Sequence, residues 1–284
     1  MDEPRIYKHS LIQTILAVVV VGAVFAVIFL SEEWNNLTYL FPLAIFVLVM
    51  SGAVVTVTQK TIVSDDEISS LNLFGAKTLR WNEINRVSGK GYSIKLHNFD
   101  GDVTVAPSPN LPGYEEVVEW IGIKRPDLFS PQEYSEMKRN IPSTVLFAGF
   151  VLLVVIALLS FGVMSFYNNE NLAALFPLAF VLLTVFVVFG IFFFFQPQSL
   201  TLEGRSLQVK YLFSERTLLA DEITSIDLRY SQSRNGKNYF VQLTQTNKKK
   251  MKISGLNLSV SIVYLVLKNW HGKNSSIGLT TQRN

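Results

Sequence analysis

Long apolar runs alternate with polar segments along this chain. Four runs contain no Asp, Glu, Lys, Arg or His, and they cover residues 11–30, 37–57, 145–167 and 172–195. A helix of about 20 apolar residues has the length needed to cross the hydrocarbon core of a bilayer. The pattern therefore predicts four membrane-spanning helices, arranged as two hairpins. No small-residue cleavage site follows the first run, so we expect an uncleaved anchor and not a signal peptide.

The chain contains an internal tandem repeat. Residues 36–44 return as residues 171–179, and the pair Leu73-Phe74 returns as Leu212-Phe213, 139 positions later. A repeat of this kind sets the architecture, because each copy folds as one unit of structure. Each copy is predicted to be an apolar hairpin followed by a polar segment.

The polar segments alternate apolar and polar residues and are rich in β-branched side chains, which is typical of strands. In the first copy the predicted strands are 56–63, 68–74, 78–81, 92–97 and 103–106, closed by a helix at 114–121. In the second copy they are 199–202, 207–213, 216–220, 239–245 and 250–254, closed by a helix at 258–270. Between the copies, Ser130-Pro131-Gln132-Glu133 has the form of a capping box and predicts a short connector helix over 131–139.

Composition supports a membrane protein and excludes several chemistries. Only 17% of the 284 residues are charged, and the mean hydropathy is +0.30. The absence of cysteine rules out disulfides, thiolate metal ligands and cysteine nucleophiles. A formal net charge of +3 gives no support to nucleic-acid binding.

The distribution of cations predicts an orientation. The loops expected at 31–36 and 168–171 contain no Lys or Arg, so all 25 of these residues fall on the other side of the predicted spans. The excess of cations on cytoplasmic loops then places both termini and both polar segments in the cytoplasm. We expect a multi-pass protein of the inner (plasma) membrane.

The order of elements in each copy resembles that of the bacterial PH-like membrane proteins, which carry pleckstrin-homology-like domains fused to transmembrane helix pairs. The resemblance rests on a spanning hairpin, a strand that follows it directly, a Gly-containing turn, an acid-Ile pair (Glu83-Ile84 and Glu222-Ile223) and a Trp-bearing closing helix. It implies two bent sheets and a C-terminal helix in each domain, and no settled activity. The arginine often found at the entry to the second strand is replaced by Glu67 in the first copy and is present as Arg205 in the second.

The predicted fold class is thus four spanning helices, as two hairpins, with two small α+β PH-like domains in tandem. The expected parts are a first transmembrane hairpin at 1–57, a first PH-like domain at 58–129, a connector helix at 130–141, a second hairpin at 142–196, a second PH-like domain at 197–271 and a flexible tail at 272–284.

Catalytic and metal-binding motifs are absent from the sequence. His9, His97 and His271 have no metal-ligand spacing. The acidic turn at 65–67 is expected to be a solvated turn, because a pair of catalytic carboxylates needs a pocket and a partner. We therefore predict no enzyme activity, no cofactor and no metal.

Two groups of residues are candidate binding sites. Cations near one predicted hairpin are either contacts for anionic lipid headgroups or a solvated turn, and they are Arg234, Lys237, Lys248, Lys249, Lys250 and Lys252. Trp120 and Trp270, on the predicted closing helices, are the expected contact surface for a protein partner.

The leading functional hypothesis is a non-enzymatic protein whose two β domains serve as membrane-proximal modules for protein interaction or self-assembly. The expected partners are therefore a membrane and a second protein or a further copy of the chain. Recognition of anionic lipid by the basic hairpin is the second hypothesis, and a transporter or channel subunit built from the repeat is the third.

Overall fold

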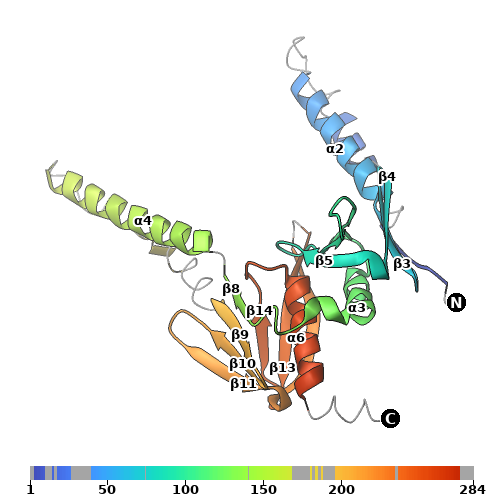
Figure 1. The fold of residues 1–284 in the computed structure, drawn as a ribbon. Coiled ribbons are helices and arrows are strands. Elements are labelled where there is room, and N and C mark those ends of the chain that lie inside the picture. The colour runs from blue at the N-terminus through green and yellow to red at the C-terminus, as the bar shows by residue number, and fades with distance from the viewer. Residues whose placement is uncertain are drawn as a thin grey trace. The chain divides into compact units, whose positions relative to one another are not determined.

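A computed structural model describes residues 3–9, 15, 18–26, 40–73, 75–139, 141–167, 180, 183–184, 187, 196–233 and 236–275 of the chain. These residues form small antiparallel sheets and a few helices (Figure 1). The chain divides into two compact units. Unit 1 combines Met1–Phe129 with Leu228–Tyr239, and unit 2 combines Ser130–Asp227 with Phe240–Asn284.

Unit 1 contains a four-stranded sheet of order β1-β2-β3-β4 and a three-stranded sheet of order β5-β6-β7. The strands are β1 (Arg5–Lys8), β2 (Lys60–Val63), β3 (Glu67–Asn72), β4 (Gly75–Arg80), β5 (Ile84–Ser88), β6 (Lys95–Asn98) and β7 (Thr104–Val105). The helices are α2 (Leu40–Thr58), α3 (Tyr114–Lys124) and the 3₁₀ helices η1 (Trp81–Glu83) and η2 (Pro126–Phe129).

Unit 2 repeats this plan, with a sheet of order β11-β10-β9-β8 and the sheet β12-β13-β14, whose connecting end belongs to unit 1. The strands are β8 (Glu136–Lys138), β9 (Ser199–Glu203), β10 (Ser206–Lys210), β11 (Glu215–Leu219), β12 (Ile223–Ser233), β13 (Gly236–Gln245) and β14 (Lys250–Ile253). The helices are α4 (Ile141–Tyr167), the 3₁₀ helix η4 (Ala220–Glu222) and α6 (Val260–Asn274).

The internal repeat is visible in the strand register. Lys60 pairs with Leu71 in unit 1, and Ser199 pairs with Lys210 in unit 2, each 139 positions later. Alternate residues of these strands are buried, since successive side chains of a strand point to opposite faces of the sheet. The predicted strands at 199–202, 216–220, 239–245 and 250–254 are confirmed as β9, β11, β13 and β14.

The closing helices cover the buried faces of the sheets. α3 buries Val117, Val118 and Ile121 completely, and acidic residues in its first turn and Lys124 in its last turn match the helix dipole. In α6 the buried run is almost continuous, from Val260 to Leu267. The predicted helices at 114–121 and 258–270 are therefore confirmed; α3 ends three residues later than predicted, and α6 starts two and ends four residues later.

The predicted fold class is wrong. Among the residues that the structure describes, no helix is long and apolar enough to cross a membrane. The structure instead supports an α+β protein made mostly of small antiparallel sheets. The predicted multi-pass inner-membrane location, with both termini in the cytoplasm, rested on the four spans and is wrong with them.

The correction concerns the four charge-free runs. The prediction treated each run as one continuous helix of about 20 residues. Within the first run only residues 15 and 18–26 are described as helical, and within the fourth only 180, 183–184 and 187; the other positions lie outside the described residues. The described helices therefore do not provide the spans that the composition predicted.

The predicted connector helix at 131–139 is also wrong. Residues 131–134 form turns, and β8 follows them and pairs with β9. Its counterpart in unit 1 is β1, which pairs with β2 and was likewise not predicted. Both strands are only three or four residues long, and each buries a single residue, Tyr7 in β1 and Met137 in β8. One buried position does not establish the alternation that identifies a strand in a sequence.

Replacing Trp270 with Phe tests the packing of unit 2. The Trp270 side chain is 1% exposed, and its indole N–H donates to the carbonyl oxygen of Gly204 at 2.7 Å. Phe lacks this donor and is smaller than the buried indole ring, so the variant loses one hydrogen bond and part of the packing, which costs about 1–3 kcal/mol. We expect urea unfolding, followed by circular dichroism, to show a loss of this size.

Trp120→Phe is the matched control, because Trp120 occupies the closing helix of unit 1 and is only half-buried. Its replacement is expected to cost less than about 1 kcal/mol. Equal losses for the two variants would contradict the structural role assigned to Trp270.

Candidate functional site

The two ends of each four-stranded sheet differ in the helices and turns that are attached to them. α2 ends at Thr58 and β2 begins at Lys60, so the helix joins the sheet at the end where β3 turns into β4. Figure 1 shows α2 running into these strands. We call this the helix end of the sheet, and we call the opposite end, where β2 turns into β3, the far end. In unit 2, β8 leads to α4 at the helix end and the β9–β10 turn lies at the far end.

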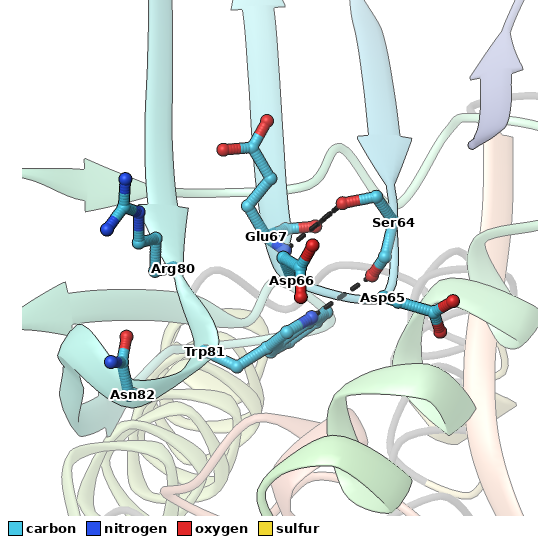
Figure 2. A pocket seen from close by; sticks show the side chains of 7 residues that line it. All are labelled: Ser64, Asp65, Asp66, Glu67, Arg80, Trp81 and Asn82. Carbon is cyan, nitrogen blue, oxygen red and sulfur yellow. Dashed lines mark hydrogen bonds between the residues drawn. The ribbon is translucent and has the colours of Figure 1, made fainter. Parts of the chain in front are cut away.

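A pocket of about 600 Å³ lies at the far end of unit 1 (Figure 2). Its lining comes from the β2–β3 turn and from the junction of β4 with η1. We call it the acidic pocket, and its lining residues are Ser64, Asp65, Asp66, Glu67, Arg80, Trp81 and Asn82. The sequence prediction of a solvated acidic turn missed this pocket, because its second wall comes from a segment 13 or more positions further along the chain.

Hydrogen bonds fix the turn that forms the acidic pocket. The Ser64 hydroxyl accepts from the backbone N–H of Glu67 at 3.1 Å, as a side chain that replaces a backbone partner in a turn does. The indole N–H of Trp81 donates to the Ser64 carbonyl oxygen at 3.1 Å, and the Trp81 backbone N–H donates to the Asp66 carbonyl oxygen at 3.0 Å. Trp81 is 7% exposed and anchors the turn from below, as Figure 2 shows.

The lining of the acidic pocket holds three carboxylates and one guanidinium. The Asp65 carboxylate accepts from the Lys124 ammonium group at 2.9 Å, so α3 already partly balances this charge. Glu67 is the register partner of Arg80 across β3 and β4. Asp66 is exposed, and Figure 2 shows its carboxylate between those of Asp65 and Glu67. A pocket with this balance of charge favours a cationic ligand such as a lysine or arginine side chain.

Metal binding finds no support in the described part of the chain. No group of three or more His, Asp or Glu side chains is arranged there to hold a metal ion. His97 contacts the hydroxyl groups of Ser88 at 2.7 Å and Thr104 at 3.0 Å, and His271 contacts the Ile223 carbonyl oxygen at 2.8 Å. These histidines serve local packing in the sheets.

Four of the predicted lysines gather at the far end of unit 2. Lys248 and Lys249 lie in the connection between β13 and β14, and Lys250 begins β14; all three are exposed, and we call them the basic turn. Thr246 beside them donates its backbone N–H to the Glu222 carbonyl oxygen at 2.9 Å, which ties the basic turn to η4. Lys252 is also exposed, and its ammonium group lies 4.1 Å from the centre of the Phe240 ring.

Of the other two predicted cations, the structure describes Lys237. Arg234 lies outside the described residues. Lys237 belongs to unit 1, where its side chain is only 17% exposed. Its ammonium group is 3.8 Å from a Glu115 carboxylate oxygen and 4.4 Å from the centre of the Tyr230 ring. The charge of Lys237 is therefore engaged within unit 1.

Lys237 lies beside a cluster of four tyrosines that the sequence did not reveal. The Tyr239 ring packs against those of Tyr92, Tyr114 and Tyr230, at centroid distances of 5.9, 5.3 and 5.6 Å. Its hydroxyl donates to the Pro109 carbonyl oxygen at 3.0 Å. Tyr92 and Tyr114 are more than 100 positions from Tyr239 in the sequence, so no local pattern connects them to it.

The two tryptophans predicted as a contact surface have different environments. Trp270 is buried, with its N–H bonded to Gly204, so it supports the fold of unit 2 and presents no surface. Trp120 is half-buried, and its ring lies between the Arg5 guanidinium at 4.9 Å and the Lys124 ammonium group at 5.5 Å. Of the two tryptophans, only Trp120 is accessible to solvent to an appreciable extent.

The chain matches no protein-family model, and no curated protein matches it in sequence. The resemblance to bacterial PH-like membrane proteins therefore stays a prediction.

Titration of Tyr239 provides a test of the tyrosine cluster. Burial, and next the nearby Glu115 carboxylate, raise the pKa of Tyr239 above its ordinary value of 10.0. The folded state thus prefers the protonated tyrosine, and the stability that this preference provides is present below pH 10 and is lost as the pH rises above it. Tyr239→Phe removes this group and, at neutral pH, about 1 kcal/mol of hydrogen bonding.

We expect the free energy of unfolding of the native protein to fall more steeply than that of Tyr239→Phe between about pH 9 and pH 11. Urea unfolding at a series of pH values measures both slopes. Parallel slopes would contradict the placement of Tyr239 in a buried, acid-flanked site.

Proposed function

We propose that this chain is a non-enzymatic interaction protein that associates with copies of itself, with the basic turn of one copy docking in the acidic pocket of another. The observation that carries the proposal is the acidic pocket, a hollow of about 600 Å³ with more carboxylates than cations in its lining. The chain also carries a complementary partner for it, because the basic turn presents three consecutive exposed lysines.

The shapes of the two surfaces support this pairing. The basic turn lies where the antiparallel strands β13 and β14 are joined, and the backbone of Lys248 is in the left-handed conformation with φ 64°. The acidic pocket is concave and is held rigidly by Trp81 and Ser64. Lysine side chains are long enough to place their ammonium groups near Asp66 and Glu67 while their alkyl stems stay over the Trp81 edge.

The expected contact is weak and dependent on salt. Exposed ion pairs contribute little each, so several must act together. The two surfaces differ, so the contact is of the head-to-tail kind and leads to closed rings or open chains of copies. Complementary charge also favours fast association at low ionic strength.

Lipid recognition by the basic turn, the second hypothesis from the sequence, uses the same lysines and stays a prediction. The two hypotheses differ in the role that they give to the acidic pocket. Self-association requires both surfaces, whereas lipid binding by the basic turn requires only the lysines.

Charge reversal on each surface tests the proposal. Sedimentation velocity of the full-length protein is expected to show association that weakens about tenfold between about 0.05 M and 0.5 M salt. Asp66→Lys with Glu67→Lys, or Lys249→Glu with Lys250→Glu, should each abolish association at low salt. Mixing the two double variants should restore it, because the acidic pocket of the turn variant can bind the native basic turn of the pocket variant. The acidic turn of the first is also complementary to the basic pocket of the second.

Asp100→Lys with Asp102→Lys is the matched control. These exposed carboxylates lie in another acidic turn of unit 1, outside the acidic pocket, so their reversal changes net charge equally without touching the proposed contact. If this control weakened association equally, the cause would be the change in net charge and not the loss of the proposed contact. A protein that stays monomeric at every concentration and salt would overturn the proposal.

A further inference from the structure

Exposed apolar side chains lie at the helix end of each four-stranded sheet. In unit 2, Leu212 is 40% exposed and Phe213 is 83% exposed, in the connection between β10 and β11. In unit 1, Leu73 is 51% exposed in the equivalent connection, and Phe74, which follows it in the sequence, lies outside the described residues. The exposed side chains of Leu73, Leu212 and Phe213 are not needed for the core of either unit. We call these connections the Leu-Phe turns.

The Leu-Phe turns share their end of the sheet with the apolar helices. In unit 2, Lys138 of β8 pairs with Ser199, and Ser199 pairs with Lys210, the residue that leads into the Leu-Phe turn. Three positions after Lys138, α4 begins at Ile141. The described part of α4 carries large exposed apolar side chains, such as Leu153 at 66%. The same order holds in unit 1, where α2 joins the sheet beside β3. The helix end of each unit is therefore its most apolar region.

Cations surround each Leu-Phe turn. In unit 1 the exposed residues near this end are Lys8, Lys60 and Lys77, since Lys8 pairs with Lys60 and Lys60 with the end of β3. In unit 2, Lys210 and Arg216 are exposed on the two strands that lead to the turn, together with one carboxylate, Glu215. The Arg216 guanidinium lies 5.9 Å from the centre of the Tyr211 ring.

We propose that the Leu-Phe turn of unit 2 binds the surface of an anionic lipid bilayer, with Leu212 and Phe213 in the interfacial region and the flanking cations against the headgroups. Apolar side chains that enter the interface and cations that meet anionic headgroups contribute to binding together. Lys and Arg have apolar stems that can lie along the interface while their charges reach the headgroups. Such binding needs no helix that crosses the bilayer.

The size of the turns favours a lipid surface over a protein partner. A stable protein interface buries about 800 Å² on each partner. A turn that presents one leucine and one phenylalanine offers far less area than that, and its convex shape leaves no groove for a partner side chain. A lipid interface has no fixed shape to match, so a small apolar tip with adjacent cations is sufficient for it.

A fluorescent probe at the Leu-Phe turn tests the proposal. The chain has no cysteine, so Phe213→Cys creates a single site for an environment-sensitive dye. With vesicles of equal parts phosphatidylglycerol and phosphatidylcholine, we expect dye emission to shift to shorter wavelength and to be quenched by brominated lipid. Adding Lys210→Gln and Arg216→Gln should raise the lipid concentration for half-maximal change roughly tenfold or more.

Leu219→Cys is the matched control, because Leu219 is 50% exposed on the same sheet at its far end. Its dye should not be quenched by brominated lipid. Equal quenching at positions 213 and 219, no change at 213, or an equal response to vesicles of phosphatidylcholine alone would overturn the proposal. A shift at 213 that grows with protein concentration in the absence of vesicles would assign the turn to a second protein copy and would also overturn it.

Discussion

Antiparallel pairing in the four-stranded sheets is the constraint on which the other features of each unit depend. Successive antiparallel strands reverse direction, so alternate connections fall at the same end of a sheet. The attachment of the apolar helix and the Leu-Phe turn therefore share one end, as the pairing of Lys60 with Leu71 and of Ser199 with Lys210 requires. Strands of four to six residues place the opposite turn about 15 Å away. Strand register thus separates the apolar end of each unit from its charged end.

The two copies stabilise the far-end turn with a tryptophan from different parts of the chain. In unit 1 the donor is Trp81, directly after β4; in unit 2 the equivalent position is the small buried Ala220, and Trp270 of α6 donates to the turn instead. Unit 2 also spans its turn with an ion pair between Arg205 and Asp221. This difference is the physical basis for a pocket at the far end of unit 1, where the acidic side chains of the turn surround open space. A shared fold with different far ends favours different ligands for the two copies.

Local patterns in the sequence predicted the elements that depend on local chemistry. Alternation of apolar and polar residues identified β9 and β13, and an apolar stripe identified α6, because burial of one face imposes these periods. The strands β1 and β8 were missed because each is separated in sequence from its partner strand by a long apolar stretch. The acidic residues of the pocket were noticed, but the wall that makes them a pocket comes from the β4–η1 junction. Charge-free runs were interpreted as spanning helices because of their composition. No helix in the described part of the chain is long and apolar enough to be such a span.

The tyrosine cluster has a consequence for the repeat as a whole. A simple tandem repeat would give two units, each made from one half of the sequence. Here Tyr239, from the second half, is 1% exposed among unit 1 residues, and its hydroxyl satisfies the Pro109 carbonyl oxygen. Lys237 likewise lies beside the half-buried Glu115 of α3. Without residues 228–239, residues 1–129 would expose the rings of Tyr92 and Tyr114, and the Glu115 carboxylate would lose the nearby Lys237. Both changes are unfavourable for an isolated fold. Unit 1 therefore depends on the second copy of the repeat for its own completion.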